Sequence, residues 1–231
     1  MKLSVIIPTL NEADNMAELI PLLSKGLSGK EHEILVIDAG SQDETLRISK
    51  AAGAHVTVVS PKKGRSCQMN YGASLATGDV LYFVHADTRP PVDFWADIME
   101  SLGKGFPAGC YRSAYDGKIL LMKFNAWLTR FDKLFVRGGD QSIFITKDLF
   151  EQLGGYRTDY KIMEDFEFLK RLRTAAPFRV IPREILISTR KYEDNSYLRV
   201  NLANIIVVAM YRFGASQDSL VSTYKRLLHY R

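Results

Sequence analysis

Short hydrophobic runs alternate with amphipathic segments along the N-terminal part of the chain. The strand-like runs are rich in Val, Ile and Leu and cover 3–7, 33–38, 55–59 and 80–84. Between them, apolar residues recur at helical spacing and predict helices over 16–27, 42–52 and 66–76. Pro21 lies inside the first of these helical patterns, so we expect a kink or a late restart there. Strands separated by helices at this interval predict βαβ units and a parallel sheet.

The C-terminal half has a less regular pattern. Its apolar positions predict helices over 95–102, 120–134 and 164–173, and strands over 142–146 and 178–187. Pro182 favours an edge position for the second of these strands, because proline cannot donate a backbone hydrogen bond. Residues 197–231 have a helical pattern that breaks near Gly214. Without a repeat or a low-complexity linker, we predict one domain over 1–195 and a helical extension over 196–231, packed on the domain or on a partner subunit.

Composition and charge narrow the classes of protein that fit. A chain of 231 residues with 46% hydrophobic and 25% charged residues is typical of a globular protein with one large α/β domain. The net charge of +5 suits an anionic ligand or a membrane surface, but it does not indicate a nucleic-acid-binding protein. Cys67 and Cys110 form neither a disulfide framework nor a metal-ligand pattern, so we expect a cytoplasmic protein. Pro8 interrupts the first apolar run too early for a signal peptide, and 205–210 is too short to span a bilayer.

Polar residues directly follow four of the predicted strands. They are Pro8-Thr9-Leu10-Asn11-Glu12, Asp38-Ala39-Gly40-Ser41-Gln42-Asp43, Lys62-Lys63-Gly64-Arg65 and His85-Ala86-Asp87. Because the carboxyl ends of parallel strands lie at one edge of a sheet, these segments predict a basic cluster and several carboxylates around one crevice. A nucleotide sugar needs such a mixture, since its base and ribose want hydrogen-bond partners and its diphosphate wants cations. Taken singly, each segment has a simpler explanation as a helix cap, a turn or a solvated loop.

The order of these motifs resembles the glycosyltransferases of the GT-A fold, family 2. The resemblance runs from residue 3 to about 190 and rests on 4–12, 36–45, 64–73 and 78–87. Within that family, the sequence His-Ala-Asp-Thr at 85–88 is most similar to a small bacterial branch without membrane spans. The resemblance implies the GT-A (nucleotide-diphospho-sugar transferase) fold. That fold is α/β, and we expect a mostly parallel central sheet flanked by helices, with a helical C-terminal tail.

The resemblance also implies which residues bind the nucleotide-sugar donor. They would be Pro8, Thr9, Asn11, Glu12, Asp38, Arg65, Asn70, Ala86 and Asp87. Asp38 would contact the base or the ribose, and Arg65 would lie near the base or the diphosphate. Asp87 would bind the Mg²⁺ or Mn²⁺ ion that bridges the two phosphates, because such ions take oxygen ligands.

Two residues depart from the family pattern. Ala39 replaces a usual second aspartate, so one polar contact to the nucleoside is missing. His85 replaces the first acid of the Asp-x-Asp metal motif, so Asp87 would hold the ion with phosphate oxygens and water. His85 would either be a further metal ligand or hydrogen-bond to its neighbours, and we favour the second role.

A pair of carboxylates downstream is expected to act on the acceptor. Glu164-Asp165 resembles the family's Glu-Asp motif, in which Asp165 would be the catalytic base and Glu164 would orient groups around it. The alternative is that both residues only complement the dipole of the helix they open.

Two further motifs are expected beside this pair. Gly139, Asp140 and Gln141 resemble an acceptor-side loop, for which a tight turn is an equally good explanation. The segment Arg190-Lys191-Tyr192 resembles a basic-aromatic motif that closes over the diphosphate, with Tyr192 in place of Trp.

These expectations combine into an inverting glycosyltransferase that moves a sugar from a UDP- or GDP-sugar to a hydroxyl acceptor, free or lipid-linked. The alternative is a non-catalytic nucleotide-sugar-binding or scaffold protein of the same fold. Ala39 and His85 favour this alternative, whereas Asp87 and Asp165 disfavour it. A sugar-nucleotide pyrophosphorylase is disfavoured, because 8–12 lacks the glycine-rich, arginine-bearing loop.

The apolar stripe over 198–213 leaves the partners of the tail open. It packs on the domain, pairs with a second subunit in a homodimer, or lies in a membrane interface at the inner face of the membrane. We favour packing against protein.

Overall fold

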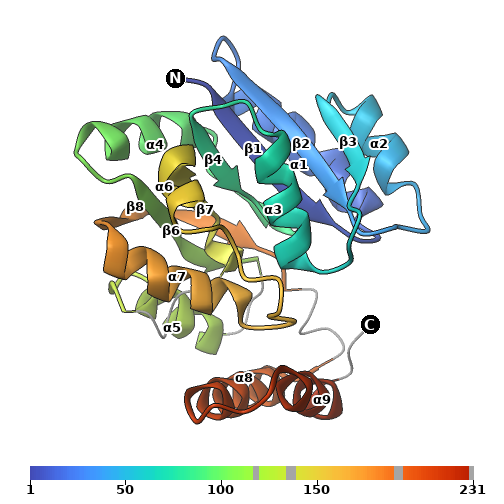
Figure 1. Cartoon of the computed structure of the whole chain (residues 1–231), viewed down its shortest axis with the longest axis vertical. Helices are drawn as coiled ribbons and strands as arrows, with labels where there is room; N and C mark the ends of the chain where they lie inside the picture. The colour runs from blue at the N-terminus through green and yellow to red at the C-terminus, as the bar shows by residue number, and fades with distance from the viewer. Residues whose placement is uncertain (117–119, 134–138, 190–194, 229–231) are drawn as a thin grey trace.

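A sheet with the strand order β3-β2-β1-β4-β7-β6-β8-β5 runs through the centre of the chain (Figure 1). The computed structural model describes residues 1–116, 120–133, 139–189 and 195–228. The strands are β1 (Leu3–Thr9), β2 (His32–Asp38), β3 (Val56–Val59), β4 (Val80–Phe83), β5 (Thr88–Arg89), β6 (Ala108–Tyr115), β7 (Ile143–Thr146) and β8 (Phe178–Ile187). The α/β class expected from the sequence is confirmed by this arrangement.

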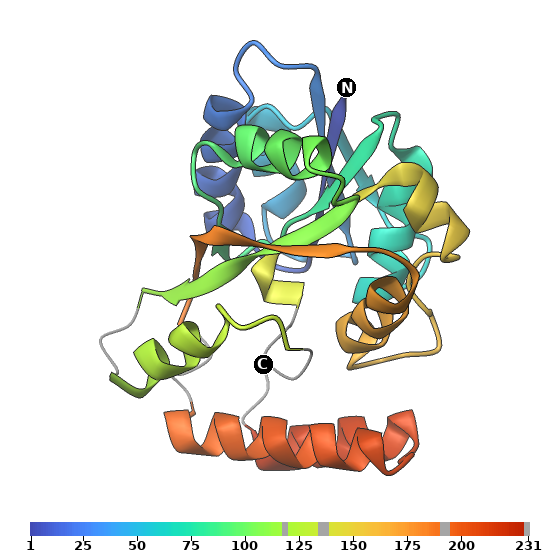
Figure 2. The ribbon, with the colours of Figure 1, turned by 90° about the vertical axis from the view of Figure 1, so that its left-hand side faces the viewer.

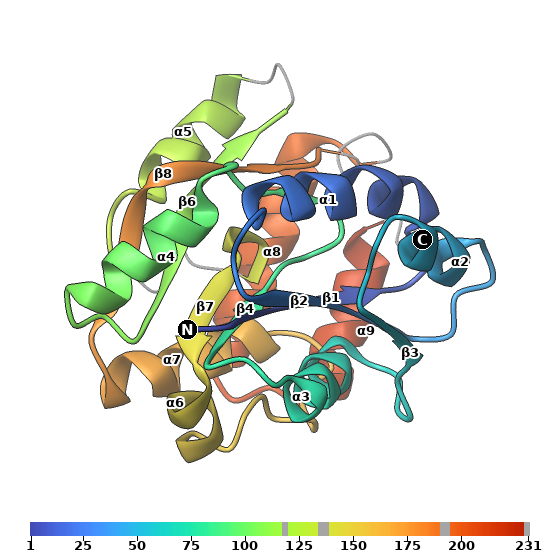
Figure 3. The same cartoon turned by 90° about the horizontal axis from the view of Figure 1, so that it is seen from above.

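Helices cover both faces of this sheet. They are α1 (Ala13–Gly26), α2 (Thr45–Ala51), α3 (Arg65–Leu75), α4 (Phe94–Gly103), α5 (Leu120–Leu128), α6 (Lys147–Gln152), α7 (Glu164–Ala175), α8 (Tyr197–Arg212) and α9 (Gln217–Leu227), with a 3₁₀ turn, η2 (Gly139–Gln141). Seen from above, α1 and α3 lie on opposite faces of β1 and β2 (Figure 3).

Alternation along the strands divides the core into two layers. On β1, Val5 and Ile7 pack with α1, whereas Ile6 packs with Met69 of α3. The same alternation on β4 directs Tyr82 towards α1 and α4, while its neighbours on the strand face α3, α6 and α7. Each strand is therefore apolar on both faces, which explains why the sequence shows continuous hydrophobic runs.

The parallel register brings the predicted loops to one edge. Strands β1, β2, β3 and β4 pair in parallel, with Thr9 opposite Asp38 and Asp38 opposite Val59. Strand β7 then pairs antiparallel with both β4 and β6, while β6 and β8 are parallel. The described sheet is thus mixed, and its parallel half carries the loops after β1, β2, β3 and β4.

Several predicted elements differ from the structure in their bounds. Helix α2 begins at Thr45 rather than at 42, because the side chain of Asp43 accepts the Thr45 N–H at 3.0 Å. Helix α5 ends at Leu128 rather than at 134, where the hydroxyl of Thr129 turns back to the Ala126 carbonyl at 2.6 Å. Helix α1 runs through Pro21 without a restart, since buried residues on both sides of the proline hold one helix against the sheet.

Strand β6 is the main element that the sequence pattern does not indicate. Its sequence, AGCYRSAY, mixes small and polar residues and has no hydrophobic alternation. It is nevertheless central, because β7 and β8 pair with its two edges. The register between β6 and β8 skips Pro182 and Arg183, so the proline lies at an irregularity of the pairing, where no donor is needed.

The C-terminal helices form a hairpin below the sheet (Figure 2). Gly214 ends α8 with a φ of 77°, and Ser216 caps α9 by accepting the Ser219 N–H, which confirms the predicted break. The hairpin contacts the rest of the chain at several points, among them Tyr211, whose ring lies 5.6 Å from that of Phe166. A boundary at 195/196 remains a prediction.

Gly109 in β6 should be intolerant of a side chain. A Cβ there would lie 2.4 Å from the Arg179 carbonyl oxygen and 2.6 Å from the Phe144 ring. We expect Gly109→Ala to lower the free energy of unfolding in urea by about 1–3 kcal/mol, because backbone on β8 cannot move aside. Gly103→Ala is the control, since a Cβ at Gly103 meets no atom within 4 Å. Equal stability of the two variants would contradict this account.

Candidate functional site

Asp38 anchors the loops after β1 and β2. Its side chain is fully buried at the end of β2. One carboxylate oxygen accepts the N–H groups of Gly40 and Ser41, both at 2.7 Å. The other accepts the hydroxyl of Thr9 at 3.0 Å and that of Ser41. The carboxylate predicted to touch the nucleoside is therefore occupied by donors of the chain itself, and a nucleoside contact would have to share one of its oxygens.

Asn11 links the two loops further out. Its backbone N–H donates to the Ser41 hydroxyl at 2.8 Å, and its side-chain oxygen accepts the Gln42 N–H at 2.9 Å. To do so, Asn11 adopts a φ of 54°, a region that asparagine tolerates better than most residues. The adjacent Glu12 donates its N–H to the Thr45 hydroxyl at 2.8 Å. The two loops thus form one unit.

Asp43 completes this unit. Burial alone would raise its pKa, but hydrogen bonds from the Thr45 side chain and from the N–H groups of Ala13 and Thr45 outweigh burial and lower the pKa below 3.8. The side chain is therefore a carboxylate at neutral pH. It accepts the N–H groups of Ala13 and Thr45, which are the first residues of α1 and α2.

Gln68 is a site residue that the sequence analysis missed. Its buried amide donates to the carbonyls of Thr9 and Ile37, at 2.8 and 2.7 Å. Helix α3 is thereby tied to the ends of both β1 and β2. A glutamine among the small and apolar residues of the buried α3 face was the available signal.

The β3–α3 loop supplies positive charge. Lys62 and Lys63 are exposed, and Gly64 adopts a φ of 117° just before α3 begins at Arg65. A guanidinium nitrogen of Arg65 lies 3.3 Å from a Glu164 oxygen and 4.0 Å from an Asp165 oxygen. The basic loop of the parallel half and the carboxylate pair of α7 therefore meet at Arg65.

The Glu164-Asp165 pair opens α7 from a strained residue. Met163 precedes it with a φ of 65°, in the left-handed region that costs a side-chain-bearing residue free energy. Glu164 is buried, and the side chain of Asp165 is 13% exposed. The pair is thus held in a fixed position at the N-terminus of α7.

Asn70 braces the loop before this pair. Its amide donates to the Tyr156 carbonyl at 2.7 Å, and its oxygen accepts the Tyr156 N–H at 2.9 Å. Tyr156 stacks on Phe168 of α7, with ring centroids 4.2 Å apart. Burial, and then the charges of Asp165 and Glu164, raise the pKa of Tyr156 well above its usual range. Asn70 thus contacts protein, and its predicted contact to the donor stays a prediction.

The turn η2 is fastened to β6. Gln141 is buried, and its amide donates to the Ser113 hydroxyl at 3.2 Å, while its oxygen accepts from the Cys110 thiol at 3.6 Å. Ser142 follows with a φ of 49°. Asp140 is half-buried beside it. Gln141 thus positions the turn that includes Gly139, and the acceptor role of all three residues stays a prediction.

The segment 85–87 follows β4 at the same edge. The Thr88 N–H and hydroxyl both donate to the His85 carbonyl, and Arg89 donates to the Ala86 carbonyl at 3.1 Å. The Asp87 carbonyl accepts the Ser188 N–H at 3.0 Å, which places the end of β8 beside it. Arg190, Lys191 and Tyr192, which follow β8, lie outside the described residues.

Asp87 has the chemistry that a divalent cation needs. Its side chain is half-buried, and none of the described residues donates a hydrogen bond to its carboxylate or pairs with it. The described residues contain no cluster of three or more His, Cys, Asp or Glu side chains that could hold a metal. A single free carboxylate fits an ion that takes its other ligands from phosphate oxygens and water.

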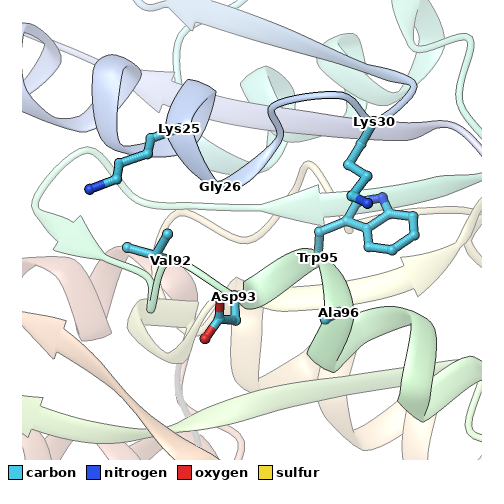
Figure 4. Close-up of a pocket in the computed structure, with 7 residues that line it drawn as sticks. All are labelled: Lys25, Gly26, Lys30, Val92, Asp93, Trp95 and Ala96. Carbon is cyan, nitrogen blue, oxygen red and sulfur yellow. The ribbon is translucent and has the colours of Figure 1, made fainter.

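A hollow elsewhere on the chain lies away from these loops. It is lined by Lys25, Gly26, Lys30, Val92, Asp93, Trp95 and Ala96 (Figure 4). Gly26 is the last residue of α1, whereas the loop after β1 precedes the first residue of that helix. The hollow is therefore at the opposite end of α1 from the candidate site.

The comparisons with known proteins agree with this geometry. The sequence profile described as "Glycosyl transferase family 2" matches residues 4–186, from β1 to the end of β8. The chain belongs to glycosyltransferase family 2.

This family 2 glycosyltransferase has several curated relatives. It is 30% identical over 176 residues to a PGL/p-HBAD biosynthesis glycosyltransferase of Mycobacterium bovis, a match that covers 71% of this chain and 67% of the relative. It is 33% identical over 109 residues to a dolichol-phosphate mannosyltransferase of Pyrococcus furiosus, covering 46% of this chain. That second match spans only 31% of the relative's length.

Solved structures share the fold of this family 2 glycosyltransferase. A mannosyltransferase from Pyrobaculum calidifontis in complex with GDP-Man and Mn²⁺ superposes with a TM-score of 0.71 at 18% identity, covering 97% of this chain and 69% of that one. Glucosyl-3-phosphoglycerate synthase from Mycobacterium tuberculosis, in complex with phosphoglyceric acid, gives a TM-score of 0.66 at 20% identity and covers 93% and 80%. At these identities the likeness confirms the fold.

Asp38→Asn should loosen the donor side of the site. The amide keeps one acceptor oxygen but replaces the other with an NH2 group that cannot accept. The bonds from the Thr9 and Ser41 hydroxyls must then reverse, or those from the Gly40 and Ser41 N–H groups are lost. We expect the free energy of unfolding to fall by about 1–3 kcal/mol in chemical denaturation. Asp148→Asn on the exposed surface of α6 is the matched control. A variant as stable as this control would show that Asp38 does not organise the loops.

Proposed function

We propose that this glycosyltransferase is an inverting enzyme that transfers a sugar from a UDP- or GDP-sugar to an acceptor oxygen. The contact of Arg65 with Glu164 and Asp165 carries the proposal. It brings the basic loop at the carboxyl edge of the parallel strands to the carboxylate pair of α7. A donor diphosphate and a catalytic base need this proximity, because the base acts on the atom that attacks the donor sugar.

The donor would occupy the edge formed by the loops after β1, β2, β3 and β4. Thr9, Asn11 and Glu12 would line the nucleoside, with backbone positions held by Asp38. The basic loop that ends in Arg65 would face the diphosphate. Two solved structures of the same fold were determined with GDP-Man or UDP, and both classes of donor suit such an edge.

A divalent ion would be held by Asp87 together with the diphosphate. When bound, Mg²⁺ or Mn²⁺ neutralises charge that develops on the departing nucleoside diphosphate. Mn²⁺ is present in the mannosyltransferase structure, and Mn²⁺ or Mg²⁺ with UDP in two structures of the mycobacterial synthase. Because Asp87 is a single carboxylate, the ion and the nucleotide would bind together. His85 would hydrogen-bond to its neighbours and would not be a metal ligand.

Asp165 would act as the general base. Its carboxylate would take the proton of the acceptor hydroxyl as that oxygen attacks the anomeric carbon from the side opposite to the diphosphate. The bond from the anomeric carbon to the phosphate oxygen breaks in the same displacement, so the configuration inverts. Glu164 would hold Arg65 beside the base, and Tyr156 would keep its proton in this buried position.

The class of acceptor decides whether this base is needed. A hydroxyl acceptor must lose a proton as it attacks, whereas a phosphate acceptor is already ionised near neutral pH. The relatives include a dolichol-phosphate mannosyltransferase and an undecaprenyl-phosphate 4-deoxy-4-formamido-L-arabinose transferase of Klebsiella pneumoniae. The names of these relatives support a lipid-linked acceptor for this chain, used at the inner face of the membrane. We propose a hydroxyl as the attacking group because the Glu164-Asp165 pair would supply a base, which an ionised phosphate would not need.

Asp165→Asn should separate binding from turnover. The amide cannot take the proton, so we expect the release of nucleoside diphosphate from the donor to fall by about 10²–10⁴-fold. Nucleotide affinity, measured by calorimetry, should stay within about twofold of the native value, because the base is not a donor ligand. Asp148→Asn is the control for a surface charge. Undiminished turnover would exclude Asp165 as the base and would point to an acceptor that is already ionised.

Asp87→Asn should abolish the joint binding of metal and nucleotide. The electron paramagnetic resonance signal of free Mn²⁺ falls when UDP or GDP is added, because the nucleotide itself binds the ion. We expect a larger fall when the native chain is present with the nucleotide. The variant should lack this extra loss, because one amide oxygen is a poor substitute for the free carboxylate. His85→Ala tests the alternative ligand in the same experiment. Loss of Mn²⁺ binding in His85→Ala but not in Asp87→Asn would reverse the assignment.

A further inference from the structure

Helix α5 presents large apolar side chains to solvent. Leu121, Phe124 and Trp127 are 50%, 57% and 43% exposed, and Phe131, just beyond the helix, is 44% exposed. The three aromatic rings form a continuous row, since Trp127 lies 6.0 Å from Phe124 and 4.8 Å from Phe131 between ring centroids. Aromatic side chains of this size are normally buried, so this row marks an interaction surface.

Helix α8 presents a second apolar row. Leu198, Leu202, Ile205 and Phe213 follow one another at helical spacing and are all exposed, with Phe213 at 92% and Leu198 at 71%. The opposite side of α8 is buried, because Val200 packs with other buried residues in the small core between α8 and α9. This row is thus not needed for the packing of the hairpin.

The two helices meet at one end. The Asn125 amide donates to the Asn201 side chain at 3.0 Å, and the Tyr197 hydroxyl donates to the Leu121 carbonyl at 3.1 Å. Both helices lie on the lower side of the chain in Figure 2, with α5 next to β6 and the hairpin of α8 and α9 below it. We call the exposed apolar rows of α5 and α8 together the α5–α8 face.

The charged residues of α5 and α8 have one sign, and the nearby carboxylate of Asp132, which follows Phe131, pairs with Arg173 at 2.9 Å. Lys123 on α5 and Arg212 on α8 are exposed, and Arg130 lies over the Trp127 ring at 5.4 Å from its centroid. The sequences of α5 and α8, LLMKFNAWL and YLRVNLANIIVVAMYR, contain no Asp or Glu. A second copy of the chain docked on this face would therefore bring like charges together, whereas an anionic surface would complement them.

We propose that the α5–α8 face docks on the surface of an anionic lipid bilayer. Apolar and aromatic side chains would enter the boundary between headgroups and acyl chains, and the basic residues would meet anionic headgroups. No helix among the described ranges is both long and apolar enough to cross a membrane, so these helices would lie in the plane of the interface.

The position of the α5–α8 face relates it to the proposed function. Tyr211 of α8 contacts Phe166, the residue that follows Asp165. A bilayer under the α5–α8 face would therefore lie near the acceptor side of the site, where a lipid-linked acceptor would arrive. This consequence rests on the proposed function, whereas docking on the bilayer does not require catalysis.

Vesicle binding tests the surface directly. The full chain is mixed with vesicles of phosphatidylglycerol and phosphatidylcholine, or of phosphatidylcholine alone, and bound protein is measured by flotation. We expect strong binding to the anionic vesicles, and binding lower by roughly fivefold for each basic residue lost in the variants Lys123→Gln and Arg212→Gln. The emission of Trp127 should shift to shorter wavelength on the anionic vesicles, and a Trp95→Phe background isolates this signal.

The variant Phe124→Ser/Trp127→Ser/Ile205→Ser removes three apolar contacts of the face. We expect its partition onto anionic vesicles to fall by about tenfold or more, because each buried aromatic or aliphatic side chain contributes to interfacial binding. Val92→Ser, at an exposed apolar position in the hollow between α1 and α4, should bind vesicles like the native chain. Phe213→Ser changes a single apolar residue of the face. Because this side chain is 92% exposed, the change should not disturb the fold.

Three outcomes would overturn the proposal. They are no binding to anionic vesicles, equal binding by the native chain and the triple variant, or a native dimer that becomes a monomer in the triple variant without vesicle binding. The last result would assign the α5–α8 face to a protein partner. Nucleotide affinity, measured in parallel without lipid, reports separately on the proposed function.

Discussion

The buried carboxylate of Asp38 is the constraint on which the site depends. An ion without exposure to water would cost several kcal/mol if it were unpaired, so the chain must supply donors at the carboxyl end of β2. Thr9, Gly40 and Ser41 supply them. Because Thr9 is also the last residue of β1 and pairs with Asp38 in parallel register, both loops must leave the sheet together. The floor of the proposed donor site is therefore held by contacts within the chain itself.

The two halves of the site are joined by side chains that touch protein. Gln68 ties α3 to β1 and β2, Asn70 holds the loop before the carboxylate pair, and Gln141 fastens η2 to β6. Arg65 then crosses from α3 to Glu164 and Asp165. Such bracing fixes the positions of a few exposed groups, which is how an enzyme lowers the cost of ordering its substrates.

The sequence predicted the parallel half of the fold and its loops well, because strands buried on both faces show continuous apolar runs and end in recognisable polar turns. It did not predict β6, whose small and polar residues are buried only because β7 and β8 flank them. The roles of the site residues remain predictions, and their contacts within the chain could not be predicted from the sequence. Asn70 and Gln141 were expected to face ligands, and nothing local in the sequence shows that their amides are used by Tyr156 and Ser113. The roles of residues 190–192 remain predictions.

The most direct test of the central claim is a calorimetric titration of the native chain with UDP and with GDP, each with Mn²⁺ and then with EDTA. The claim is that the edge formed by the loops after β1, β2, β3 and β4 is a nucleotide-diphosphate site completed by a metal at Asp87. It predicts that one nucleotide binds with Mn²⁺ and that EDTA removes or greatly weakens this binding. Absence of binding by either nucleotide in the presence of Mn²⁺, or equal affinity with EDTA, would contradict it.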